Sequence, residues 1–162
     1  MTIRDATLAE LPAVVAIYNT TVASRMVTAD TEPVSVESRV QWFQDHSPGR
    51  RPLWVAEEGG GIAGWLSYSS FYGRPAYSGT CEISLYLAPE WRGQGLGSRL
   101  LGRAIEHAPR IQVTTLLGFI FGHNEPSLRL FEKHGFIRWG CLPRVALLDG
   151  IERDLVIEGR RI

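Results

Sequence analysis

Two kinds of hydrophobic pattern take turns along the chain. Apolar residues at every second position, or in short unbroken runs, are typical of strands, whereas apolar residues three and four positions apart are typical of helices. The first pattern predicts strands at residues 2–6, 53–56, 62–69, 80–87, 112–121, 138–148 and 152–157. The second predicts helices at residues 7–19, 35–46, 98–108 and from 124 or 127 to 135. The first helix opens with a capping box, Thr7-Leu8-Ala9-Glu10.

The order of these elements predicts the topology. A strand, a helix and a second strand follow one another over residues 80–121, an arrangement that joins two parallel strands. Turns at 57–61 and at Asp149-Gly150 join antiparallel hairpins. We therefore expect an α/β fold (α+β in some schemes) with a mixed, mostly antiparallel sheet, a parallel central pair and flanking helices. No repeat or long linker interrupts residues 1–162, which predicts a single domain.

Composition narrows the function classes. The 17 basic and 17 acidic residues cancel, so general binding of nucleic acid, which needs a basic excess, is not expected. The sequence contains no run of about 18 apolar residues, which a membrane span would need, and no apolar segment of the signal-peptide type. We therefore expect a cytoplasmic protein. Cys81 and Cys141 lack metal-ligand spacing, and the four histidines add none, so we expect no metal site.

Three alternating glycines occupy the turn between the strand at 80–87 and the next helix, in the segment Arg92-Gly93-Gln94-Gly95-Leu96-Gly97. Bare backbone lets amides converge at a helix N-terminus, where an anion is favoured. The segment lacks the lysine of a P-loop and has the wrong glycine spacing for a dinucleotide fingerprint. We interpret it as a phosphate-binding turn. The alternative is a tight turn that needs a positive φ at one glycine.

A carboxylate, a hydroxyl and a phenol share one face of the strand at 80–87. Alternation places Glu82, Ser84 and Tyr86 on that face and apolar residues on the other. A central strand of an α/β fold is usually apolar on both faces, so this pattern indicates a wet cleft. An edge strand with a solvated face is the alternative, and the apolar strand at 112–121 argues against it.

Several of these segments resemble one family. The pattern R-x-x-G-x-G after Pro89-Glu90-Trp91 resembles the acetyl-coenzyme A signature of the GNAT acetyltransferase superfamily. Its second coenzyme A segment is similar to residues 124–127 (Asn-Glu-Pro-Ser) and 131–136 (Phe-Glu-Lys-His-Gly-Phe). The narrower phosphinothricin and methionine-sulfoximine N-acetyltransferase group is similar to residues 16–19, 31–33, 74–77 and 80–86. The resemblance covers nearly the whole chain.

The resemblance implies a GNAT acyltransferase fold, an acetyl-CoA cofactor and a set of residues that bind it. The amides of Leu85, Tyr86 and Leu87 would pair with the pantetheine arm. The pyrophosphate would be held by the turn and the start of the helix, namely Arg92, Gly93, Gln94, Gly95, Leu96, Gly97 and Ser98. Asn124 would contact the pantetheine, with Ser127 close by.

Transfer of an acetyl group to an amine explains the carboxylate. An ammonium has no lone pair, and an α-amine with a pKa near ~8 is largely protonated at pH 7, so a base must take its proton. Glu82 is the candidate, as the resemblance also implies. Strand amides near Leu85 would polarise the thioester carbonyl. Many GNAT members place a tyrosine seven residues after the asparagine, but this chain has Phe131, which leaves Tyr86 or solvent to protonate the departing thiolate.

The acceptor is predicted from the same resemblance. Arg74 would grip a substrate carboxylate, with Pro75, Ala76 and Tyr77 beside it, although a surface arginine is an equal alternative. Departures from the group at Ala29 and in the hairpin at 146–154 leave phosphinothricin, methionine sulfoximine and related amino acids open as the small-molecule amine. The family implies a homodimer. Two other functions stay open: acetylation of a protein N-terminus or peptide, and a non-catalytic acyl-coenzyme A sensor.

Overall fold

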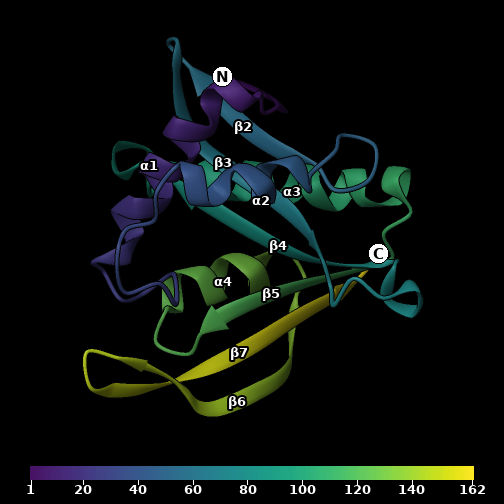
Figure 1. Cartoon of the computed structure of the whole chain (residues 1–162). Helices are drawn as coiled ribbons and strands as arrows, with labels where there is room; N and C mark the ends of the chain where they lie inside the picture. Colours follow the sequence, from purple (N-terminus) through teal and green to yellow (C-terminus); the bar gives the residue numbers. More distant parts are fainter.

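A computed structural model describes all residues 1–162 and contains one seven-stranded sheet in the order β1-β2-β3-β4-β5-β7-β6 (Figure 1). The strands are β1 (Thr2–Asp5), β2 (Leu53–Glu58), β3 (Gly61–Ser70), β4 (Thr80–Leu87), β5 (Thr115–Phe121), β6 (Ile137–Leu148) and β7 (Ile151–Arg161). Every neighbouring pair is antiparallel except β4 and β5, which are parallel. The predicted mixed, mostly antiparallel sheet with a parallel central pair is therefore confirmed.

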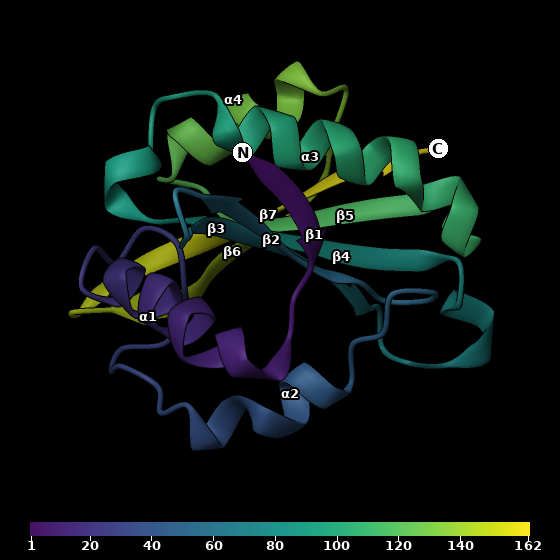
Figure 2. The same cartoon turned by 90° about the horizontal axis from the view of Figure 1, so that it is seen from above.

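Helices cover both faces of the sheet. Figure 2 shows α1 (Leu11–Val22) and α2 (Val40–Gln44) on one side, with α3 (Leu96–His107) and α4 (Glu125–Lys133) on the other. The larger core cluster lies between the sheet and α3 and α4, and a smaller one lies beneath α1. Buried hydrogen bonds tie both layers to β3: Trp65 Nε1 donates to the Val14 carbonyl at 3.0 Å, and Tyr68 Oη donates to the Ala104 carbonyl at 2.6 Å. No helix is long and apolar enough to cross a bilayer.

The parallel pair is short. β4 and β5 are paired only from Thr80 to Glu82 on β4, whereas the pairing of β4 with β3 continues to Leu87. The two strands then diverge, as Figure 1 shows. Beyond Glu82, the β5-facing edge of β4 has no partner strand, although it lies in the middle of the sheet. Such an edge leaves backbone donors and acceptors available to a ligand.

Two strand boundaries differ from the sequence prediction. The strand expected from residue 112 begins at Thr115, because Ala108–Ile111 form a 3-10 turn and Gln112 takes a left-handed φ of 59°. The last strand was expected to end at 157 but continues to Arg161. Its polar end pairs with Thr115 and Leu116 of β5, and this long-range pairing outweighs local composition.

Candidate active site

The polar face of β4 borders a cavity of about 230 Å³ between the sheet and the helices α1 and α2. Glu82, Ser84 and Tyr86 lie on its wall, as alternation predicted. The other lining residues come from α1, α2, β3 and their connections: Val14, Val15, Tyr18, Val34, Arg39, Trp42, Trp65, Ser67 and Ser69. β4 is flanked by β3 and β5, so the edge-strand alternative is wrong and the polar face lines a cavity.

Glu82 is the one carboxylate on this cavity wall. It lies at the last paired position of β4 with β5, opposite Ser69 on β3. Burial raises its pKa, and the Ser84 hydroxyl opposes that shift by hydrogen bonding to the carboxylate. A carboxylate with a raised pKa is a stronger proton acceptor than an exposed one, so Glu82 has the character that a base requires.

Tyr86 lies between the cavity and a second pocket. Its ring stacks on Trp65 with centroids 4.6 Å apart and tilts against Tyr18 at 5.1 Å. Besides the cavity that contains Glu82, it lines a groove that runs to the glycine-rich turn. Burial is the main reason why the pKa of its phenol is raised, so the hydroxyl keeps its proton near neutral pH. The side chain therefore carries a proton at the junction of the two spaces.

The groove has a volume of about 580 Å³ and is bounded by the glycine-rich turn, α4, β4 and the end of α1. Gly93 and Gly95 adopt left-handed φ values of 70° and 82°, and Gly95 is the N-cap of α3. A Cβ on Gly97 would lie 3.2 Å from Leu130 Cδ2, so this glycine permits α3 to pack closely against α4. The turn thus aims the free amides of the first turn of α3 at the groove.

Ten of the predicted cofactor residues line this groove: Leu85, Tyr86, Leu87, Arg92, Gly93, Gly95, Gly97, Ser98, Asn124 and Ser127. The side chains of Gln94 and Leu96 do not. Gln94 is exposed and donates to the Glu90 carbonyl, and Leu96 is 2% exposed in the main core. Lys133 also lines the groove, and the sequence analysis missed it. In the sequence, Lys133 comes after the apolar positions of α4, and a charged residue at that place is typical of the solvated end of a helix.

Asn124 caps α4, because its Oδ1 accepts a hydrogen bond from the Ser127 amide at 3.3 Å. Phe131 lies seven residues after Asn124, about two helical turns further along α4. It is 4% exposed, and its ring packs edge-on against Phe136 with ring centroids 4.8 Å apart. It also presses on β5, where a Cβ on Gly118 would lie 2.5 Å from its Cε1. Phe131 is therefore a packing residue that has no proton to donate.

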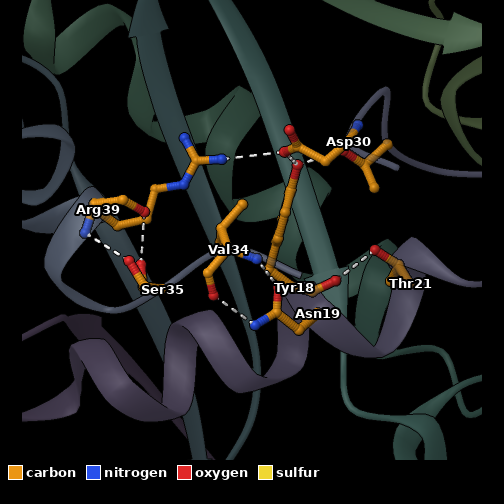
Figure 3. Close-up of polar contacts among 9 residues, drawn as sticks. Tyr18, Asn19, Thr21, Asp30, Val34, Ser35 and Arg39 are labelled. Atoms are coloured by element: carbon orange, nitrogen blue, oxygen red, sulfur yellow. Dashed lines mark hydrogen bonds and ion pairs between the residues drawn. The ribbon is translucent and has the colours of Figure 1, made fainter. Parts of the chain in front are cut away.

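Residues 23–35, which we call the strap, connect α1 to α2 and run beside all of these spaces. Val27 lines the groove, Ala29 lines a separate hollow next to Glu82, and Val34 lines the cavity that contains Glu82. Figure 3 shows how the strap is held: Tyr18 Oη donates to the Asp30 carboxylate, which also pairs with Arg39 at 3.1 Å. The Asn19 amide makes hydrogen bonds of 2.9 Å with both the N–H and the carbonyl of Val34.

Arg74 lies elsewhere. With Pro75 and Tyr77 it lines a separate hollow of about 290 Å³ beside Arg50 and Arg51. Ala76 is exposed in the same short turn. Tyr77 is 42% exposed and packs against Phe71 and Tyr72. The structure therefore does not bring Arg74 into the cavity with Glu82. The guanidinium that lines that cavity belongs to Arg39, which no spacing in the sequence distinguished from a surface arginine of a helix.

β4 separates from its parallel neighbour β5 beside a groove that is bounded by glycines and suited to an anion. A cavity that contains a carboxylate and a phenol adjoins this groove at Tyr86. This is the arrangement of an acyltransferase that uses a coenzyme A thioester. The family model described as "Acetyltransferase (GNAT) family" matches residues 14–136. The chain belongs to this family, and the predicted acetyltransferase activity and acetyl-CoA cofactor are confirmed with it.

Similar proteins agree with this membership. The chain is 55% identical to the "Putative phosphinothricin acetyltransferase YwnH" of Bacillus subtilis (strain 168), covering 100% of this chain and 99% of the other. It is 33% identical to the L-methionine sulfoximine/L-methionine sulfone acetyltransferase of Pseudomonas aeruginosa, over 94% of this chain and 90% of that protein. A phosphinothricin acetyltransferase from Sinorhizobium meliloti, solved in complex with acetyl-CoA, superposes with a TM-score of 0.93 at 28% identity, covering 99% and 88% of the two chains.

Proposed function

We propose that this acetyltransferase acts on the amine of a small amino-acid-like substrate, such as phosphinothricin, methionine sulfoximine or a related compound, by direct transfer. The observation that carries the proposal is the position of Tyr86, on the wall of both the cavity and the groove. An acceptor in the cavity and a thioester in the groove would meet there. The names of two similar proteins support this class of acceptor.

The groove fits acetyl-CoA on the chemistry of its walls. Arg92, Lys133 and the amides that begin α3 supply positive charge and donors for the pyrophosphate, and the unpaired edge of β4 supplies backbone groups for the pantetheine. Asn124 and Ser127 would lie along the same arm. When bound, acetyl-CoA supplies an activated acetyl thioester.

Different residues of the chain would then accept and donate the protons of the reaction. The Glu82 carboxylate would accept the proton of the ammonium, directly or through a water in the cavity. Amides of β4 near Leu85 would donate to the carbonyl oxygen as it becomes negative. The Tyr86 hydroxyl would donate its proton to the thiolate, and solvent is the alternative donor because Phe131 cannot serve. Cys81 lies on the opposite face of β4, is completely buried and takes no part.

A small acceptor is favoured over a peptide, because the cavity beside Glu82 has a volume of only about 230 Å³ and is bordered by α1, α2 and the strap. Membership in an acetyltransferase family together with a carboxylate of raised pKa favours an enzyme over a sensor. Two arginines are candidates for the acceptor carboxylate. Arg74 is implied by the family resemblance, and Arg39 is supported by its place in the cavity. A cytoplasmic location stays a prediction of the sequence.

We also propose a homodimer that covers β6. This edge strand and its hairpin expose apolar side chains of Ile137, Trp139, Leu142, Val145, Leu147 and Ile151. A second copy would remove this row from water and protect the open edge. Val145 and Ala146 also line the hollow next to Glu82, so the partner would lie close to the acceptor. Sedimentation equilibrium tests this: Leu147→Lys should produce monomers, and a monomeric unmodified protein would refute the proposal.

The central test supplies acetyl-CoA with a panel of amines and follows release of the free thiol. Phosphinothricin, methionine sulfoximine, methionine sulfone, ordinary amino acids, polyamines and short peptides form the panel. We expect turnover with at least one amino-acid-like acceptor and little with peptides. Turnover of peptides alone would establish the peptide function instead, and tight coenzyme binding without turnover of any amine would establish the sensor.

A further inference from the structure

A histidine lies directly behind the groove. Ser98, in the first turn of α3, lines the groove, and its Oγ lies 2.7 Å from Nε2 of His134. His134 is the C-cap of α4, so this hydrogen bond joins the beginning of one helix to the end of another. Both side chains are half-buried, and His134 itself does not line the groove.

The imidazole is held in place from two further sides. A Cβ on Gly102 would lie 3.5 Å from His134 Cε1, so the ring packs on the bare backbone of α3 one turn beyond Ser98. Arg160 on β7 donates a hydrogen bond to the His134 carbonyl. A ring that is packed and anchored in this way is a fixed partner for Ser98 rather than a surface group that meets it by chance.

The direction of this hydrogen bond decides what Ser98 offers to the groove. A serine hydroxyl has one proton and two lone pairs. If Nε2 is unprotonated, Ser98 donates to it and turns oxygen lone pairs toward the groove, where they would repel a phosphate. If Nε2 carries a proton, His134 donates to Ser98, and the hydroxyl proton is free to point at the phosphate. A bound phosphate therefore selects the two states of His134 that are protonated at Nε2, the neutral Nε2–H tautomer and the imidazolium, and its negative charge favours the imidazolium of the two.

We propose that His134 is a positioning residue for the coenzyme: through Ser98 it sets the donor that meets the pyrophosphate, and it takes up a proton when the coenzyme binds. The proposal rests on the cofactor groove assigned above. The ligand is the phosphate part of coenzyme A, with or without an acetyl group.

The charges that face His134 determine the sign of the effect. In the free protein, burial lowers its pKa, and the neighbouring cations Lys133 on α4 and Arg160 on β7 lower it further. Ser98 and Gly102, which face it from α3, are uncharged. The free histidine is therefore mostly neutral at pH 7. Phosphate charge in the groove opposes those cations and favours the imidazolium, so the pKa rises on binding. Affinity for the coenzyme is then strongest below the pKa of the free state and declines as pH rises through the pKa of the bound state.

A double-mutant cycle on coenzyme A binding tests whether His134 acts through Ser98. We expect His134→Leu to weaken binding about three- to tenfold at pH 6.5, the range of one ordinary hydrogen bond. Ser98→Ala should weaken binding by a similar factor, and His134→Leu should add nothing in the Ser98→Ala background. His107→Gln, at the far end of α3, is the matched control and should bind like the unmodified protein. Independent, multiplicative losses in the double variant would overturn the proposal.

Proton uptake separates titration from packing. Calorimetry of coenzyme A binding at pH 6.5 in buffers of different ionisation enthalpy gives the number of protons taken up. We expect less uptake for His134→Gln, whose amide can donate to Ser98 but does not titrate, with an affinity that varies less with pH. Equal uptake in the two proteins would overturn the titration. If His134 and Ser98 variants bind normally while Gly95→Val abolishes binding, only this inference fails. If Gly95→Val also binds normally, the groove assignment itself fails.

Discussion

Replacing Glu82 by glutamine keeps the shape of the side chain and removes the proton acceptor, so it isolates the role of the base. The other titratable groups on the cavity wall are Tyr18, Tyr86 and Arg39. The pKa of each tyrosine is raised, chiefly by burial, so neither can accept a proton near neutral pH. The cavity wall therefore offers no substitute base, and the variant must wait for acceptor molecules that are already deprotonated.

That requirement sets the magnitude. For an α-amine with a pKa of about 8, roughly 1% is free at pH 6, roughly 10% at pH 7 and most above pH 9. Relative to the unmodified enzyme, kcat/KM of Glu82→Gln should fall about 100-fold at pH 6, about 10-fold at pH 7 and only slightly at pH 9. Because the pKa of Glu82 is raised, the unmodified enzyme should itself lose activity on the acid side as this carboxylate is protonated.

Thiol release at saturating acetyl-CoA, measured from pH 5.5 to 9.5, gives both profiles. Glu106→Gln, an exposed glutamate on α3, is the control and should follow the unmodified enzyme. A loss that is the same at every pH would show that Glu82 acts on binding or packing, and an undiminished rate at pH 6 would refute its role as base.

Three further predictions concern the groove, the packing behind it and the acceptor. Gly95→Val should abolish measurable coenzyme binding in calorimetry, because valine at a φ of 82° costs about 1–3 kcal/mol and would redirect the amides of α3, whereas Gly49→Ala, in open space, should bind normally. Gly118→Ala should lower the free energy of unfolding by about 1–3 kcal/mol in urea titrations, because its Cβ would lie 2.5 Å from the buried ring of Phe131; an unchanged midpoint would show that β5 and α4 separate easily. Arg39→Met should raise KM for an amino-acid acceptor more than Arg74→Met does if the carboxylate of the acceptor binds in the cavity. The reverse order would place that carboxylate at the hollow lined by Arg74.

The parts of the site that follow from local pattern were predicted well. Alternation along β4 placed Glu82, Ser84 and Tyr86 on one face, and glycine spacing located the turn before α3. Both signals depend only on residues that are neighbours in the sequence. The family resemblance also implied Gln94 and Leu96 as coenzyme contacts. Their side chains turn outward and into the core, so only their backbone groups are left to meet a phosphate, because the direction of each side chain depends on the exact backbone of the turn.

Other parts depend on contacts between distant segments, which a single sequence does not reveal. Arg39, which lines the cavity, pairs with Asp30 on the strap, and His134 meets Ser98 across 36 positions of the chain. The parting of β4 and β5 after Glu82 has no signal in either strand, since both read as ordinary apolar or alternating segments. It results from the register and twist of the whole sheet.

The parted strands also have a consequence for stability. Peptide groups in the middle of a sheet are normally the most protected in a protein, but those of β4 beyond Glu82 face no strand on one side. A bound pantetheine would complete the ladder there, so coenzyme binding and local stability become the same event. Amide hydrogen exchange should then be fast in the free protein at those N–H groups of Ile83–Leu87 that point away from β3, and slow once coenzyme A is added, whereas the N–H groups bonded to β3 stay protected in both states. The hydrogen-bond ladder along this edge of β4 would be complete only while the coenzyme is bound.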